Sequence, residues 1–240
     1  MNNINEYFFY GIFKGILLTT IVFLFIIWNK QEYKNLIKKI FLFSGILVFF
    51  NLIIIFILFY NKMNTKIIET PDLRQAYTYT CGASALQTIL FYYGEDIREG
   101  YLAKELNTTS DWGTEHTSIE KIALKYGLKL DMRKMTADDL KNFIDKKIPV
   151  ILAIQAWSDN KKIDYKNDYD DGHYVVAIGY NKKGFIFEDP SSVGRGFLTY
   201  EELETRWHDI DKAGKPLEHL GIAIYGKPVK YNLNLIEHID

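Results

Sequence analysis

Two long apolar runs dominate the first quarter of the chain. The first covers residues 8–28, in which Lys14 is the only charge, and the second covers residues 40–60. Each run has the length of about 20 residues that an α-helix needs to cross the hydrocarbon core of a bilayer. A pair of buried helices in a soluble protein is the alternative. We favour a transmembrane helical hairpin in residues 1–66, in contact with the lipid bilayer through residues 8–60.

The charges around the two runs predict an orientation. The loop between them, residues 29–39, has four lysines and one glutamate, whereas no lysine or arginine precedes the first run. The positive-inside rule therefore places the loop in the cytoplasm and both termini outside. Lys62 and Lys66 follow the second run and act in the opposite sense. We expect a multi-pass membrane protein with two spans and an extracytoplasmic C-terminal domain.

After residue 66 the pattern changes to short segments of helical and strand periodicity. Helical spacing occurs first at 83–93, 97–106, 118–126 and 136–146, and a short helix begins at Thr199. Strand patterns occur at 128–132, 149–157, 173–180, 184–188 and 220–225. Helices that precede most of the strands indicate an α+β fold with segregated layers. Residues 67–240 are enough for one domain with a sizeable core.

The net charge of −1 hides an asymmetry between the two parts of the chain. Residues 1–66 carry seven lysines against two glutamates, whereas residues 67–240 carry 22 basic and 28 acidic residues. The larger part is therefore acidic and lacks the basic stripe of a nucleic-acid-binding domain. We expect no nucleic-acid partner.

Motifs for other ligands do not match. The nearest approach to a phosphate loop begins at Gly179 but has Phe185-Ile186 where Lys-Ser/Thr is required. Residues 167–172 suggest a calcium loop, yet Tyr169 stands where an acidic or amide ligand is needed. The histidines show no metal-ligand spacing. We therefore expect no nucleotide, no cofactor and no metal.

Cys81 is the only cysteine, so the chain cannot form an internal disulfide. It stands at the start of an apolar helical pattern, where unpaired amides and the helix dipole favour the thiolate, the nucleophilic form. We expect Gly82 and Ala83 to leave room for a substrate at the sulfur. A small buried hydrophobe is the alternative role for a free cysteine. We interpret Cys81 as a candidate nucleophile.

Three further residues supply the partners that such a nucleophile needs. His173 leads an alternating apolar strand and could act as the base, and Asp189 ends the next strand and could orient the imidazole. Gln75 could donate its amide to the developing oxyanion beside the backbone N–H of the cysteine. Each residue alone also has a purely structural reading, such as a turn at Asp-Pro. Three tryptophans could line a substrate groove, with packing as the default: Trp112, Trp157 and Trp207.

Three motifs together carry a resemblance to a known family: Gln75-x5-Cys81-Gly82, Gly172-His173-Tyr174-Val175-Val176 and Asp189-Pro190. They resemble the peptidase C39 family, the papain-like cysteine peptidases of bacteriocin-processing transporters and their stand-alone relatives. The resemblance covers residues 74–200 and implies a papain-like α+β fold with a helical half and an antiparallel sheet half. It also implies that Cys81 is the nucleophile, His173 the base, Asp189 the orienting carboxylate and Gln75 the oxyanion donor.

The resemblance also implies a peptide or protein substrate. Transporter-linked members of that family remove leader peptides after a Gly-Gly pair on the cytosolic side, but this chain has no room for an ATPase, and its lysine bias favours an external domain. We therefore expect a membrane-anchored, stand-alone cysteine peptidase, with a Gly-Gly leader as one substrate class. Two alternatives stay open: a non-catalytic leader-peptide-binding module, and a cell-wall amidase or transpeptidase that uses the same triad.

Overall fold

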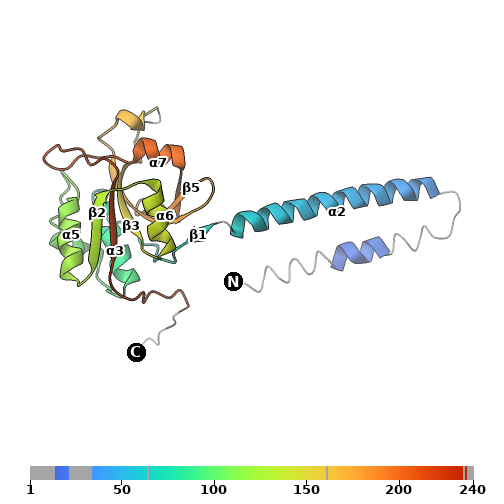
Figure 1. Cartoon of the computed structure of the whole chain (residues 1–240), viewed down its shortest axis with the longest axis horizontal. Coiled ribbons are helices and arrows are strands. Elements are labelled where there is room, and N and C mark those ends of the chain that lie inside the picture. The colour runs from blue at the N-terminus through green and yellow to red at the C-terminus, as the bar shows by residue number, and fades with distance from the viewer. Residues whose placement is uncertain (1–13, 22–33, 64, 161, 235, 237–240) are drawn as a thin grey trace. The chain divides into compact units, whose positions relative to one another are not determined.

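The computed structural model describes residues 14–21, 34–63, 65–160, 162–234 and 236 of the chain (Figure 1). Contacts divide the chain into two compact units, Met1–Lys62 and Met63–Asp240. The first is helical where it is described, and the second contains the sheet and the predicted site residues.

The N-terminal unit contains helix α2 (Lys34–Met63), and residues 14–21 are also helical. Within α2, Lys38–Ile57 is long and apolar enough to cross a membrane, and none of it is buried. It is the one such helix in the described part of the chain. Most of the other predicted span, residues 8–28, lies outside the described residues. In place of the predicted two-helix hairpin, the described residues therefore contain one apolar helix of membrane-spanning length. A single membrane anchor and a signal sequence each have one such helix.

The C-terminal unit is built on an antiparallel sheet with the strand order β2-β7-β3-β4-β5-β6, and β1 pairs with β4 beside this path. The strands are β1 (Lys66–Ile67), β2 (Lys129–Lys134), β3 (Val150–Gln155), β4 (Gly172–Tyr180), β5 (Gly184–Glu188), β6 (Gly196–Thr199) and β7 (Leu220–Tyr225). Every residue of β3 and all but the two end residues of β4 are buried. Side chains alternate between the two faces of a strand, so both faces of the sheet are covered at its centre.

Five helices and one 3-10 turn accompany this sheet: α3 (Cys81–Tyr92), α4 (Glu99–Glu105), α5 (His116–Lys125), α6 (Ala137–Asp145), α7 (Tyr200–Arg206) and η2 (Tyr165–Asn167). Helix α3 packs on β4 and also contacts α4 and α5, while α6 contacts β4, β3 and β1 (Figure 1). The structure thus confirms an α+β domain with the predicted helices and strands. The short elements β1, β6 and η2 were not predicted, because two to four residues carry too little periodicity.

Gly82 fixes how closely the start of α3 packs against its neighbours. A Cβ atom at this position would lie 2.6 Å from the Cβ of Thr114 and 3.0 Å from Cδ2 of Tyr174 in β4. Both Gly82 and Ala83 are buried. The expectation that these small residues leave room for a substrate is therefore wrong, because the space beside Gly82 is filled by Thr114 and Tyr174.

We predict that Gly82→Ala lowers the stability of the C-terminal domain by about 1–3 kcal/mol, the usual cost of overpacking. Gly100→Ala is the matched control, because a Cβ there meets nothing within 4 Å and alanine favours the helix. Thermal unfolding of the full-length variants in the same detergent would compare them. Equal melting temperatures for Gly82→Ala and the wild type would contradict the packing argument.

Candidate active site

The structure brings three of the predicted residues together at one end of the sheet. Cys81 is the first residue of α3, His173 is the second residue of β4, and Asp189 directly follows β5. All three are buried, with exposed fractions of 7%, 6% and 6%. The Nε2 atom of His173 lies 2.8 Å from Oδ1 of Asp189. The other ring nitrogen, Nδ1, is thereby left for the thiol.

The histidine is held in its charged form. Burial acts to lower the pKa of His173, but hydrogen bonding to Asp189 and to Cys81, together with the charges of both, raises it to about 9. An imidazolium beside a sulfur favours the thiolate.

Asp189 is positioned by two further donors. Its Oδ1 also accepts a hydrogen bond from the backbone N–H of Ser191 at 2.9 Å, and its Oδ2 accepts one from Nε1 of Trp157 at 3.0 Å. Burial acts to raise the pKa of Asp189, but the hydrogen bond from His173, the charge of the ring and these two donors lower it overall. The carboxylate is therefore ionised and fixed in orientation.

Trp157 has a role that its sequence position did not suggest. It follows β3 with a φ of 65°, in the left-handed region, and its side chain is 57% exposed. An exposed tryptophan in a strained backbone conformation is unusual for a packing residue, and here its indole N–H binds Asp189. Of the other tryptophans expected near a groove, Trp112 lines the pocket beside Cys81, and Trp207 is buried in the core.

Gln75 lies near these residues, but its side chain is engaged elsewhere. Its Nε2 donates to the carbonyl oxygen of Tyr77 at 2.8 Å, and its Oε1 accepts a hydrogen bond from Oγ of Ser191 at 3.1 Å. Its backbone N–H also donates to the carbonyl of Pro190. In this arrangement Gln75 ties the segment before α3 to the loop after Asp189. Its role as an oxyanion donor stays a prediction.

The N-terminus of α3 offers another donor. No side chain caps this helix, because the Thr80 hydroxyl bonds to the backbone of Tyr77 instead. The backbone N–H of Cys81 has no acceptor among the described residues. Unpaired amides at a helix N-terminus point at anions, so this N–H is free for a negative oxygen at the reacting carbon.

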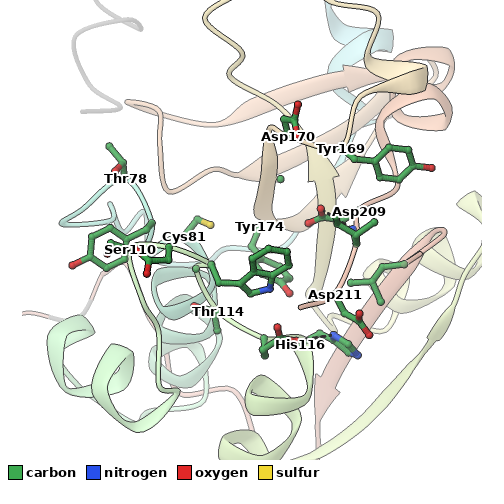
Figure 2. A pocket seen from close by; sticks show the side chains of 18 residues that line it. Thr78, Cys81, Ser110, Thr114, His116, Tyr169, Asp170, Tyr174, Asp209 and Asp211 are labelled. Carbon is green, nitrogen blue, oxygen red and sulfur yellow. Dashed lines mark hydrogen bonds and ion pairs between the residues drawn. The ribbon is translucent and has the colours of Figure 1, made fainter. Parts of the chain in front are cut away.

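A pocket of about 380 Å³ opens beside Cys81 (Figure 2). The loop 110–116, the segment 169–174 and the segment 209–217 contribute most of its lining. In Figure 2, Asp209 and Asp211 lie across the pocket from Cys81, and Asp170 lies at the top of the view. An elongated group could therefore reach from the thiol to these carboxylates.

Asp209 is the main site residue that the sequence did not single out. Burial raises its pKa to about 6, although the backbone N–H of Ile210 and the amide of Gln155 act to lower it. Oδ1 and Oδ2 both approach Gly172, where a Cβ would lie 2.8 Å from each oxygen. The sequence places Gly172 before His173 but gives no reason for a glycine there. The structural reason is this close approach of a carboxylate from a distant segment.

A family profile described as the peptidase C39-like family matches residues 58–215, which is more than half of the 240-residue chain. The match confirms the resemblance that the three sequence motifs indicate. No curated protein matches the chain at a significant level.

Solved structures of related domains resemble the chain at low sequence identity. A putative C39-like peptidase from Bacillus anthracis has a TM-score of 0.53 and 18% identity over 69% of this chain and 99% of its own. The peptidase domain of Streptococcus ComA, a bi-functional ABC transporter, has a TM-score of 0.49 and 22% identity over 67% and 99%. A double glycine motif protease from an AMS/PCAT transporter, crystallised with the leader peptide, has a TM-score of 0.48 and 19% identity over 67% and 94%. At such identities, the Bacillus anthracis match supports the fold alone.

We predict that iodoacetamide alkylates Cys81 at about pH 6 roughly tenfold faster than it alkylates N-acetylcysteine. The raised pKa of His173 keeps the ring charged until the pH approaches about 9. Cys81 should therefore react faster than N-acetylcysteine up to about pH 8. In Asp189→Asn the pKa of the His173 ring should return toward its usual value. The rate difference between Cys81 and N-acetylcysteine should then decrease between about pH 6 and 8. Intact-mass analysis measures each rate, because Cys81 is the only thiol.

Denatured protein serves as the control and should react like the free thiol at every pH. Two results would contradict the charged-histidine argument. One is a folded wild-type protein that reacts no faster than N-acetylcysteine, and the other is an Asp189→Asn variant with the wild-type pH profile.

Proposed function

Because the chain belongs to the peptidase C39-like family, we propose that it is a cysteine peptidase that hydrolyses a peptide bond through Cys81, His173 and Asp189. The observation that carries the proposal is the buried 2.8 Å contact between His173 and Asp189 at the side of the single thiol. A buried strand-end histidine with a structural role only would not need a carboxylate and a cysteine on its two sides.

The first half of the reaction forms an acyl-enzyme. The Cys81 thiolate attacks the carbonyl carbon of the scissile peptide bond, and the carbonyl π electrons move to its oxygen. When the tetrahedral adduct collapses, the C–N bond breaks and the His173 imidazolium gives its Nδ1 proton to the leaving amine. The products of this half are a thioester on Cys81, a free amine and a neutral imidazole.

The second half returns the enzyme to its starting state. Neutral His173 takes a proton from a water molecule, whose oxygen attacks the thioester carbon. The C–S bond then breaks, the carboxylic acid product leaves, and the thiolate–imidazolium pair is restored. Asp189 stays ionised throughout and holds the ring by its Nε2–H, as the carboxylate of a catalytic triad does.

The negative oxygen of both tetrahedral adducts needs donors. The backbone N–H of Cys81 is the first of these, because it has no acceptor among the described residues. The Gln75 amide is the proposed second, and to serve it must release the Tyr77 carbonyl or use its other N–H. Loss of one such donor typically costs about 2.7–4 kcal/mol of transition-state stabilisation.

The proposal includes a membrane anchor. Helix α2 has a 20-residue segment that is apolar and long enough to span a bilayer, and the lysine-rich loop before it favours an extracytoplasmic domain. A second span in residues 8–28 remains part of the proposal. An anchored peptidase would act on peptides that leave or cross the membrane, including precursors with a Gly-Gly leader.

We predict that cells that carry Cys81→Ala accumulate uncleaved precursors of peptides that wild-type cells process. Quantitative mass spectrometry of secreted and membrane peptides would detect them. Cys81→Ala is suitable because it removes one sulfur from a buried position and keeps the helix. Precursor cleavage sites that follow Gly-Gly would identify the leader-peptide class of substrate.

Two results would distinguish the rival functions, and one variant serves as a control. Identical peptide profiles, with full biological function in Cys81→Ala, would contradict a peptidase and favour a binding module that uses the cleft without chemistry. Products joined to an added amine, instead of free acids, would show acyl transfer, as in a cell-wall transpeptidase. Gly100→Ala, which changes a surface position of α4, should leave the peptide profile unchanged.

A further inference from the structure

The pocket beside Cys81 has a strongly one-sided charge. Five carboxylate side chains line it: Asp111, Glu115, Asp170, Asp209 and Asp211. None of its described lining residues is a lysine or arginine. Its volume of about 380 Å³ lies within the range of about 300–1,000 Å³ that is usual for ligand sites.

The protein does not neutralise these carboxylates itself. Among the described residues, none of the five forms an ion pair with a lysine or arginine, and Glu115 has a 3.9 Å contact with Nδ1 of His116 and a hydrogen bond from the backbone N–H of Lys212. Asp209 uses Oδ1 to accept hydrogen bonds from Gln155 and Ile210, and its Oδ2 accepts none from the described residues. Like charges held together in a partly buried pocket repel each other, and a cation would relieve that repulsion.

A buried tyrosine whose hydroxyl has no protein partner among the described residues also lines this pocket. Tyr174 is 7% exposed and lines the pocket, yet its phenol makes no hydrogen bond within the described part of the chain. Burial, followed by the charges of Asp209, Cys81 and Glu115, raises its pKa well above the ordinary value, so the phenol stays neutral. Buried polar groups are normally satisfied. This oxygen can therefore accept a hydrogen bond from a bound group.

The site suits an extended organic cation better than a metal ion. No cluster of three or more histidine, cysteine, aspartate or glutamate side chains in the described residues could hold a metal. Aromatic residues, including Tyr79, Trp112 and Tyr169, line the pocket together with the acids. Aliphatic stems and cationic heads of lysine and arginine pack well on such rings.

We propose that this pocket is a substrate subsite that binds a lysine or arginine side chain of the peptide whose scissile bond lies at Cys81. The proposal rests on the peptidase function proposed above, since it uses the same cleft. Asp209 and Glu115 are the specificity-determining residues, because both line the pocket together with Tyr174 and the carboxylate of Asp209 lies against Gly172, next to His173. The aspartates at the far side of the pocket hold the head of the longer side chain.

The charge of the pocket can be measured without any peptidase activity. Cys81 is the only cysteine, so two methanethiosulfonate reagents of similar size, one with a trimethylammonium group and one with a sulfonate group, report on the potential at its sulfur. The full-length protein is used at about pH 8, above the pKa of about 6 of Asp209. The ratio of the two rates, cationic reagent over anionic reagent, should be about tenfold or more higher for Cys81 than for a free thiol.

A double variant, Asp209→Asn with Glu115→Gln, tests the residues. Each substitution keeps the side-chain oxygen that accepts a backbone hydrogen bond, from Ile210 at position 209 and from Lys212 at position 115. The double variant should reduce the preference for the cationic reagent several-fold. Asp138→Asn with Glu201→Gln removes the same charge from exposed helix positions outside the pocket and should leave it unchanged. A wild-type ratio equal to that of the free thiol, or a ratio that the pocket variant does not change, would overturn the proposal.

Peptide probes then test the substrate class. Tripeptides that end in a vinyl methyl ester, with lysine, norleucine or glutamate at each position in turn, label the thiol covalently. At one position lysine should label about tenfold faster than norleucine, and the pocket variant should lose this preference. Equal rates for lysine and norleucine at all positions would overturn the proposal. If no probe reacts while the reagent preference holds, the peptidase function fails, and with it the substrate subsite, although the acidic charge of the pocket is confirmed.

Discussion

The contact between His173 and Asp189 is the interaction on which the rest of the site depends. A buried imidazole would ordinarily be neutral, because burial penalises the charged form. Here a carboxylate with donors on both oxygens lies 2.8 Å from the ring and keeps it charged. The antiparallel pairing of β4 with β5 brings the start of β4, which contains His173, close to the end of β5, which Asp189 directly follows. The chemistry of the thiol thus depends on the geometry of one hairpin.

Two glycines allow the segments around this hairpin to approach it. Gly82 lets α3 pack against Thr114 and Tyr174, which brings the N-terminus of the helix to the end of β4. Gly172 lets the carboxylate of Asp209 lie against the backbone next to His173. Any larger residue at either position would need one of these neighbours to move. Cys81, His173 and the acidic pocket are therefore linked through close backbone contacts.

The sequence predicted those parts of the site that lie in regular elements. Cys81 and His173 begin a helix and a strand of clear periodicity, and Asp189 ends the next strand of the same hairpin, so their order predicted their meeting. Asp209 and Trp157 lie in irregular segments whose path depends on tertiary contacts, such as the bond from Gln155 to Asp209. No periodic pattern could place them. The role of Gly82 was misread because its neighbour Thr114 lies in a loop.

The site contains both negative and positive groups near the thiol, and the balance of these charges affects which substrates it favours. Cys81 lies beside groups of opposite charge, the carboxylates of the pocket and the imidazolium of His173. The imidazolium and the N-terminus of α3 both offset the acids next to the sulfur. A basic side chain in the pocket would neutralise part of the negative charge when the substrate binds. Binding energy from a remote group would then stabilise the thiolate, which is how recognition can raise the rate of the chemical step.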